Sequence, residues 1–462
     1  MATCPDVLLG RKQQVWVALE ETPGMIAFPS AQDIINPTSD VAMNQETPVT
    51  DSREKADTLD VLNVFQGIAS EGSATLNFYL RTAGVDKPPQ GERLIVAAIG
   101  KIAAPATGEL EEAILDSDTT ITIENVVGTL PRRGVIELTS TDQKEQILYT
   151  LAEESPSLPG TWTLSNLTRG YNGTTAMSGT IGDSVAVKSR WYAQDTCRSA
   201  VSIWVRTDTL LQCMVGSSVT QFTIPFQEED AVELQFTVSG QRVYNAGRSD
   251  LSAIAEKSAT SLKVDDARAF FVGQRIQNLT KKDDNAEAGY AVTAINEDTN
   301  TLTIAPGISS AWAVDDVITW WMPSGTPVGD EVENRDTVVF VAGESLVMLP
   351  GSLSIGTPVG RIATVGTRFP GQGIDTTRNI TIDYTMLATN DAAVRLRDGF
   401  EGTEQRFDAV MGNRQGRKMA AVGPRMKLTT ASVTFQDPAV TLASNGRFLG
   451  IKGEDSLQLI LE

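Results

Sequence analysis

The sequence predicts a mainly β protein: an antiparallel β-sandwich core with short helices and two inserted small β-barrel or β-sandwich modules. Residues 15–19, 74–80, 232–238, 337–341 and 380–384 alternate apolar with polar side chains or are rich in β-branched and aromatic residues, as strands are. The 38 glycines and 20 prolines separate these runs and mark turns. One stretch with a fixed order of short strands also occurs twice, which indicates an architecture of several β parts.

Two segments have the features of helices. Residues 92–99 place their apolar side chains on one face. Residues 391–398 follow Thr389-Asn-Asp391, a sequence typical of a helix start, and stop before Gly399. We therefore expect two short helices in a chain that is otherwise made of strands.

The repeated stretch covers residues 119–191 and 260–321, and the two copies match in order and spacing although their identity is low. Each copy contains five short strands in roughly 60–75 residues, enough for a small barrel or sandwich. Tryptophan follows each copy, as Trp191 and as Trp320-Trp321. Such a side chain either closes the base where the chain re-enters its host domain or is an ordinary core aromatic.

The remaining sequence joins into one core once the two copies are removed. At 462 residues the chain is long enough for several domains. Each half of the core has strands, one polar loop and one helix, so we hypothesise two tandem sandwiches. The predicted parts are residues 1–112 plus 192–258 (first half), 113–191 (first module), 259–322 (second module) and 323–462 (second half).

The chain is strongly acidic, with 38 Lys and Arg against 58 Asp and Glu and a net charge of −20. This balance argues against binding nucleic acid by neutralising phosphates, which needs a basic surface. It is compatible with a surface that DNA slides past, where like charge prevents sticking. It is equally compatible with a charge that only keeps a large protein soluble.

Histidine is absent, which removes Ser-His-Asp and Cys-His catalysis and histidine metal sites. Cys4, Cys197 and Cys213 are an odd number without Cys-x-x-Cys spacing, so a reduced cytoplasm is the simpler interpretation than a disulfide framework. The N-terminus does not resemble a signal peptide, and no apolar stretch approaches the ~20 residues that cross a bilayer. We expect synthesis and assembly in a cytosol.

We predict no catalytic, cofactor-binding or metal-binding residues, no cofactor and no enzymatic activity. Residues 356–360 are rich in glycine but lack the Gly-Lys-Ser/Thr of a phosphate loop. Asp116, Asp118 and Glu124 form a fragment of a calcium loop without its glycine. Two acidic clusters are more typical of solvated loops; they are Glu109, Glu111, Glu112, Asp116 and Asp118, and Asp283, Asp284 and Glu287.

Aromatic and basic side chains offer further alternatives. The tryptophans and Tyr79, Tyr192, Tyr244 and Tyr384 could stack on sugars or bases, but aromatic residues in strands are more often core. Two short basic patches are either hairpin tips or contacts between acidic subunits; they are Lys281-Lys282, and Arg414, Arg417 and Lys418.

Three segments in order resemble the major tail tube protein of tailed bacteriophages. Residues 20–24 read Glu-Glu-Thr-Pro-Gly, residues 72–80 read Gly-Ser-Ala-Thr-Leu-Asn-Phe-Tyr-Leu, and residues 91–100 follow as a short helix. In that family an E-E-T-x-G segment opens the first sheet and a G-S-A-T-x-x-F-Y-L strand precedes a helix. Residues 167–176 are also similar to a segment of small β-modules in phage tail and baseplate proteins, although Ser178 stands near the position where those modules have histidine.

The resemblance implies a structural virion protein, a tail tube subunit. Such subunits form hexameric rings that stack into a hollow conduit for DNA ejection, with an inner wall made from the sheets of neighbouring subunits. The partners would be the protein itself and other tail proteins: baseplate, terminator, tape measure and, in a contractile tail, sheath. Phage DNA would transit without specific binding, and the location would be the virion tail after assembly in the cytoplasm of the host bacterium.

Two features extend this expectation. The polar segment 41–61 has little hydrophobic pattern, and we expect it to order against the adjacent ring. The two modules would point outward because the lumen has no room for them. The alternatives are another virion structural protein (baseplate, terminator or decoration subunit) and a glycan-binding adhesin that works through its modules.

Overall fold

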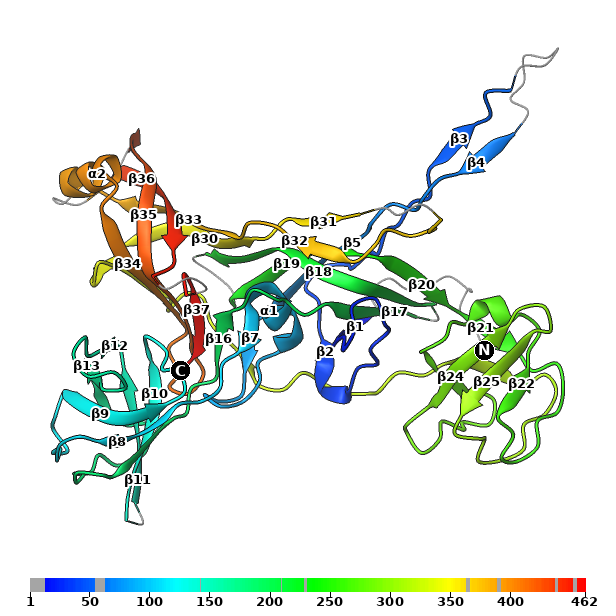
Figure 1. Cartoon of the computed structure of the whole chain (residues 1–462), viewed down its shortest axis with the longest axis horizontal. Coiled ribbons are helices and arrows are strands. Elements are labelled where there is room, and N and C mark those ends of the chain that lie inside the picture. Colours follow the sequence, from blue (N-terminus) through cyan, green and yellow to red (C-terminus); the bar gives the residue numbers. More distant parts are fainter. Residues whose placement is uncertain are drawn as a thin grey trace.

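The computed structural model describes residues 13–54, 63–141, 143–208, 210–227, 231–362, 366–388, 392–436, 439–451 and 455–462. It confirms a mainly β protein, with 52% strand and 5% helix and with antiparallel sheets. Among these residues, no helix is both long and apolar enough to cross a membrane. Figure 1 shows an elongated molecule with two small modules, one near each end.

The first half of the core folds into what we call the first unit. Its elements are β1 (Gln13–Leu19), β2 (Ile34–Ile35), β5 (Gly72–Tyr79), α1 (Glu92–Ile99), β17 (Val201–Thr207), β18 (Leu210–Phe226), β19 (Glu233–Gly240) and β20 (Arg242–Ala246). β1 pairs with β2 and β17, β17 with β18, β18 with β19 and β20, and β19 with β5. All these pairs are antiparallel, and α1 lies against β18 and β1.

The second half folds into what we call the second unit. Its elements are β28 (Val338–Val341), β29 (Glu344–Leu346), β30 (Met348–Gly356), β33 (Asn379–Leu387), α2 (Ala392–Glu401), β34 (Glu404–Met411), β35 (Met419–Gln436), β36 (Ala439–Leu449) and β37 (Gln458–Leu461). β28 pairs with β29 and β34, β34 with β35, β35 with β36 and β37, and β36 with β33.

The two units therefore repeat one pairing scheme in one order along the chain. β1, β2, β5, β17, β18, β19 and β20 correspond to β28, β29, β33, β34, β35, β36 and β37, and α1 corresponds to α2. Both copies break register at the same two places. At the second break Thr220 and Thr429 each donate a hydroxyl to a carbonyl on the next strand at 3.1 Å, so positions of β18 and β35 differ by 429 − 220 = 209.

A continuous antiparallel sheet runs through both units in the order β5-β19-β18-β30-β33-β36-β35. One face carries the shared apolar core, with Phe78, Phe236, Leu353 and Ile382 fully buried. The alternation of buried and less buried residues puts polar side chains on the other face. Figure 1 shows α1 and both modules on the same side of this sheet, below it in the view.

The first module lies between two strands that pair with each other, β7 (Gly100–Ile102) and β16 (Trp191–Gln194). Its strands are β8 (Thr107–Leu110), β9 (Thr120–Val127), β10 (Gly134–Ser140), β11 (Gln143–Tyr149), β12 (Leu151–Glu154), β13 (Trp162–Ser165), β14 (Thr168–Tyr171) and β15 (Ser184–Val187). β8 belongs to this sheet, although the sequence assigned it to the core. The module has a core of its own around Ile136, Leu138 and Leu164.

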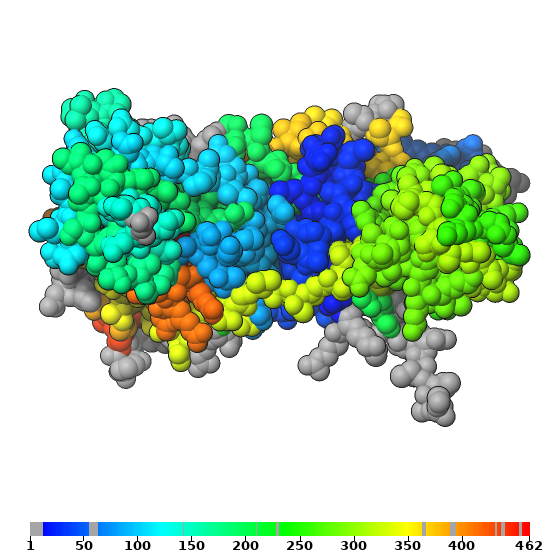
Figure 2. All heavy atoms as spheres, turned by 90° about the horizontal axis from the view of Figure 1, so that it is seen from below, coloured from blue at the N-terminus to red at the C-terminus, as the bar shows by residue number. Residues whose placement is uncertain are grey.

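The second module follows the first unit and precedes the second unit along the chain. Its elements are β21 (Arg248–Asp250), β22 (Ser261–Lys263), the 3-10 turn η2 (Ala267–Ala269), β23 (Arg275–Asn278), β24 (Tyr290–Asn296), β25 (Thr301–Ala305) and β26 (Val317–Trp320). Its strand order is β21-β26-β23-β24-β25-β22. The first module has the same order if β11 and β12 are counted together as the equivalent of β24: it reads β8-β15-β10-β11 and continues as β12-β13-β9. The sequence repeat thus reflects one shared topology, and Figure 2 shows the two modules on either side of the first unit.

The minor elements complete the chain. The 3-10 turn η1 (Ala31–Asp33) precedes β2, and two short pairs join β3 (Val49–Asp51) with β4 (Val64–Gln66) and β6 (Arg81–Thr82) with β27 (Asp330–Glu331). A third pair joins β31 (Val359–Arg361) with β32 (Gly373–Asp375).

Both helix predictions are confirmed, and one boundary was wrong. α1 matches residues 92–99. α2 continues past Gly399 to Glu401 and ends at Gly402, whose φ of 66° suits the left-handed turn after a helix. A glycine inside a helix costs only about 1 kcal/mol, so Gly399 does not stop it. The predicted cap at residues 389–391 lies outside the described residues.

Candidate assembly interface

The two units meet along one strand edge. The second part of β18, from Gln221 to Phe226, pairs with β30 in antiparallel register, Gln221 opposite Gly356 and Phe226 opposite Gly351. Thr220 O accepts from Thr357 N at 2.9 Å. Because backbone groups alternate along a strand, those of residues 222, 224 and 226 also point to β30.

The hairpin β31–β32 of the second unit makes further contacts with the first unit beside this joint. Arg361, at the end of β31, has a side chain only 1% exposed and donates to the carbonyl oxygens of Gly216 and Ser239, each at 2.7 Å. Burial lowers the pKa of Arg361, and the carboxylates of Glu71 and Glu20 oppose that shift. On β32, Asp375 pairs with Arg198 at 2.6 Å. The hairpin is therefore fixed to the first unit by buried charge and backbone contacts.

The first unit carries the equivalent hairpin, β3–β4. Both hairpins start with Thr-Pro-Val, at residues 47–49 and 357–359, a difference of 357 − 47 = 310. In both, the proline carbonyl accepts from a backbone N–H that follows the second strand: Gly67 N to Pro48 O at 2.8 Å, and Thr376 N to Pro358 O at 3.0 Å. Figure 1 shows β3–β4 projecting away from the molecule, whereas β31–β32 lies along the long sheet.

The polar segment 41–61 therefore contains a hairpin strand in its described part. Asn44 bridges Ser73 of β5, so residues 44–47 correspond to the end of β30. Residues 55–62, which include the rest of the predicted loop, lie outside the described residues. Within the described residues no strand pairs with the outer side of residues 44–47.

The opposite end of the long sheet is also open. β36 pairs with one side of β35 from Arg425 to Gln436, whereas β34 pairs with the other side only as far as Lys427. Beyond that point no described strand lies on this side. The equivalent of Phe226 is Phe435: Phe226 is 3% exposed in the joint with β30, and Phe435 is 82% exposed. The second unit thus leaves exposed, on β35, the strand edge that in the first unit is covered by β30.

The surface beside this edge is basic. Arg425, Lys427 and Arg447 occupy the positions of Gly216, Ser218 and Ser239, which differ from them by 209 or 208 residues. Glu404 binds Arg425 at 2.7 Å and Lys427 at 3.4 Å. Arg447 is exposed, and no described acidic side chain pairs with it.

The ion pairs of Glu404 with Arg425 and Lys427 lead to a prediction about how Glu404 titrates. Hydrogen bonds from Arg425 lower the pKa of Glu404 to about 2, and Lys427 adds to the shift. A carboxylate with a depressed pKa stabilises the fold above its unfolded pKa, and this contribution is lost as pH falls from about 4.5 through about 2. We expect Arg425→Met to raise the pKa of Glu404 toward 4.5 in an NMR titration. A pKa that stays near 2 in this variant would contradict the assignment.

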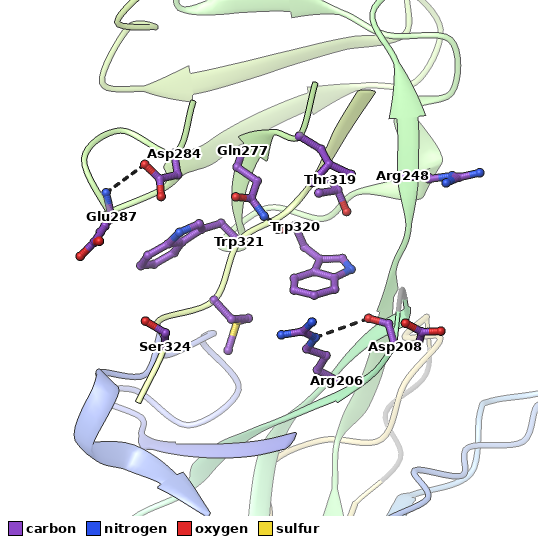
Figure 3. A pocket seen from close by; sticks show the side chains of 12 residues that line it. Arg206, Asp208, Arg248, Gln277, Asp284, Glu287, Thr319, Trp320, Trp321 and Ser324 are labelled. Atoms are coloured by element: carbon purple, nitrogen blue, oxygen red, sulfur yellow. Dashed lines mark hydrogen bonds between the residues drawn. The ribbon is translucent and has the colours of Figure 1, made fainter. Parts of the chain in front are cut away.

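Figure 3 shows a cavity of about 420 Å³ between the second module and β17. The Arg206 guanidinium lies 5.0 Å from the centre of the Trp320 ring, and its Nη1 donates to Gln14 Oε1 at 3.1 Å. Trp320 and Trp321 are buried, and Phe28 stacks on Trp321 with 6.0 Å between ring centroids. The tryptophan pair therefore packs the joint between the second module and the first unit.

The other tryptophan that follows a module has a different neighbourhood. Trp191 is 2% exposed and packs with Val410, Val422 and Ile460 of the second unit. Of the tyrosines considered for stacking, Tyr192 and Tyr384 are buried, and Tyr244 stacks on Phe271 with 4.9 Å between centroids. Tyr79 is partly buried in β5. Tyr192, Tyr244 and Tyr384 therefore have the contacts of core side chains, whereas Tyr79 lies on the polar face of β5.

The acidic clusters stay on loops and strand ends. Asp118 Oδ2 accepts from Leu115 N at 2.8 Å, the geometry of a turn. The Asp283 carboxylate accepts hydrogen bonds from the side chains of Tyr290, Ser309, Ser310 and Trp312 within the second module. Burial opposes ionisation of Asp283, but these hydrogen bonds lower its pKa overall. No group of three or more His, Cys, Asp or Glu side chains among the described residues is arranged to hold a metal ion.

The basic patches contact their own chain. Arg414 and Arg417 pair with Asp330 on β27. Lys281 lies 3.7 Å from Asp316 in the second module. Cys197 is exposed and Cys213 is buried, both as free thiols, and Cys4 lies outside the described residues.

The segment 167–176 is organised around an arginine that the sequence did not single out. Arg169 binds Glu145 with two hydrogen bonds, at 2.9 and 2.7 Å, and also donates to Leu115 O and Met177 O. The Glu145 side chain is fully buried. Gly170, with φ of 63°, donates its N–H to Glu145 at 2.8 Å. The motif thus fixes the loop through a buried ion pair as well as through its glycine turn.

Comparison of the sequence with protein-family models and with curated proteins finds no match.

Sequence reasoning missed the joint and the open edge. The recurrence of Thr-Pro-Val at residues 47–49 and 357–359, and of a phenylalanine at positions 226 and 435, are the signals that could have revealed them. Both signals are too short to stand out before the strand pairing is known.

Proposed function

We propose that this protein is a tail tube subunit of a bacteriophage, which assembles into rings that stack as a hollow conduit for DNA. The observation that carries the proposal is the joint between the two units. It is a head-to-tail contact, since the edge of β18 in one unit meets β30 of the next. Contacts of this kind generate rings when the rotation closes.

The chain ends support repetition of that contact. The second unit leaves the edge of β35 open, and the first unit leaves residues 44–47 open, in the positions that β18 and β30 occupy in the joint. An exposed strand edge normally invites uncontrolled pairing, and closure into a ring removes it. Because each chain supplies two units, a ring of six units would contain three chains instead of the six subunits implied by the resemblance.

The long sheet has the character of a conduit wall. Its face opposite the core and the modules is lined mainly by small uncharged polar residues: Ser73, Thr75, Asn77, Gln221, Thr223, Gln235, Thr237, Ser352, Ser354, Thr381, Thr385 and Asn445. The same face carries Glu233 and Asp383, and its cations gather only at one end, where Arg425, Lys427 and Arg447 lie. Away from that end the face offers DNA no cluster of cations to bind. Both modules lie on the other side, so this orientation puts them on the outside of the tube.

Negative-stain electron microscopy of the concentrated protein, with native mass spectrometry of any rings, tests the proposal. We expect hollow striated cylinders built from trimeric rings. Isolated closed rings that never stack would favour a terminator or connector. A protein that stays monomeric at its highest soluble concentration would contradict the proposal and favour the adhesin alternative.

A further inference from the structure

We propose that the open edge of β35 receives residues 43–47 of a second copy of this chain, in the register that joins the two units within one chain. The inference rests on the proposed ring assembly and specifies its contact. It follows from the correspondence between the units: β18 maps onto β35 and the end of β30 maps onto residues 43–47.

The register is fixed by residues of the known joint. Ser354 lies opposite Thr223, and their hydroxyl oxygens are 3.2 Å apart. The equivalents are Asn44 and Ser432, both exposed. Thr357 N donates to Thr220 O, and the equivalents are Thr47 and Thr429. In this register Met43 lies opposite Val433 of the neighbouring chain.

Backbone direction supports the same edge. Asn44 exchanges both its N–H and its C=O with Ser73, at 3.0 and 2.9 Å, and Glu46 O accepts from Ser70 N. The backbone groups of residues 43, 45 and 47 therefore point away from β5. By the correspondence with residues 220 to 226, those of Thr429 and Val433 point away from β36. The two open rows of donors and acceptors are complementary.

Phe435 shows that this edge is built to be covered. Its counterpart Phe226 is buried in the core that both units share and lies beside Val339, Leu346 and Met348 of the second unit. Phe435 has 82% of its surface exposed. Covering an aromatic ring of this size removes apolar surface from water and stabilises the contact. The occupant that fits is a second copy, because the segment that covers Phe226 has its counterpart at the other end of the same chain.

The hairpin β3–β4 then clasps the second unit of the neighbour, as β31–β32 clasps the first unit. Asp51 takes the place of Arg361, and Arg447 takes the place of Ser239, which Arg361 binds. The hairpin β3–β4 thus carries an acidic residue where β31–β32 carries a basic one, and the surface of the second unit that it would contact is basic. The groups facing Asp51 would be Arg447 and Arg425, with Glu404 already bound to Arg425. Complementary charge of this kind sets partner and register.

Disulfide trapping tests the register. In a background with Cys4 and Cys197 replaced by serine, Asn44→Cys with Ser432→Cys should form intermolecular disulfides on oxidation. Each chain has one site of each kind, so non-reducing gels should show a ladder that stops at the closed ring. The matched control is Thr223→Cys with Ser354→Cys, which should give an intramolecular disulfide and no ladder. Ser432→Cys with Glu46→Cys is the control for a shifted register.

Charge exchange tests the clasp. Asp51→Arg and Arg447→Asp should each reduce the assembled fraction at equal concentration by about tenfold, since like charges then face each other. The double variant should restore assembly. A lack of rescue would overturn the clasp.

The outcomes separate the register from the tube. Rings or tubes that form without the Asn44–Ser432 ladder, or that give it only with Glu46→Cys, would overturn this register and leave the proposed function intact. Absence of any ring would overturn both. A ladder that closes at three chains supports both.

Discussion

Replacing Val433 by proline is expected to abolish ring and tube formation while the monomer stays folded. The N–H of Val433 points to the open edge of β35, so proline there removes no hydrogen bond to β36. Proline is tolerated on edge strands for this reason, but it cannot donate to an added strand. The Val433 side chain is only partly buried, so we expect a stability cost of no more than about 1–2 kcal/mol. Sedimentation velocity and negative-stain microscopy measure assembly, and thermal unfolding checks the fold.

The matched control is Ile224→Pro at the equivalent position of the first unit. Ile224 is 1% exposed and faces β30 within the same chain. Loss of its buried side chain alone costs about 2–5 kcal/mol, so this variant should lose fold stability as well as assembly. Normal tubes from Val433→Pro would show that the edge of β35 is not an assembly surface.

Replacing Arg169 by alanine is expected to destabilise the first module by about 3–5 kcal/mol, the cost of leaving a buried charge without its partner. Glu145 is fully buried and receives two of its hydrogen bonds from Arg169. The remaining donors are the backbone N–H groups of Gly170 and Met177, at 2.8 and 3.1 Å. Amide hydrogen exchange should show lost protection in residues 107–187, with the units unchanged, since this module has a separate core.

Lys144→Ala is the control for this prediction. Lys144 pairs with Glu137 at 3.0 Å, but its side chain is 62% exposed. Exposed pairs contribute about 0–1 kcal/mol. A change in module stability of less than about 1 kcal/mol in Arg169→Ala would show that Glu145 finds other partners.

The helix and the modules illustrate how far local pattern reaches. Residues 92–99 form a helix as their periodicity predicts, and the two modules share one topology as their matching order of strands suggested. The exact end of α2 and the place of β8 did not follow. A glycine can sit inside a helix or just after it, and a short strand has no local feature that names its sheet.

The candidate interface lay beyond sequence reasoning for a related reason. Polar and apolar alternation in β18 and β35 determines which side chains are buried against the core. This alternation does not predict which strand pairs with the free edge of β18 or β35. Strands pair through backbone N–H and C=O groups, and these are alike in nearly all residues. Arg169 and Glu145 are likewise 24 residues apart, and only the fold brings their charges together.

The sequence by itself determined a mainly β chain with two short helices and a pair of related modules, because side-chain periodicity is local. The sequence suggested two tandem sandwiches as a hypothesis, but only the tertiary structure showed that both have one pairing scheme and that they join edge to edge. Phenylalanine occupies the equivalent positions 226 and 435, yet Phe226 is buried and Phe435 is exposed. The difference is set by β30, a strand more than a hundred residues away from β18 along the chain.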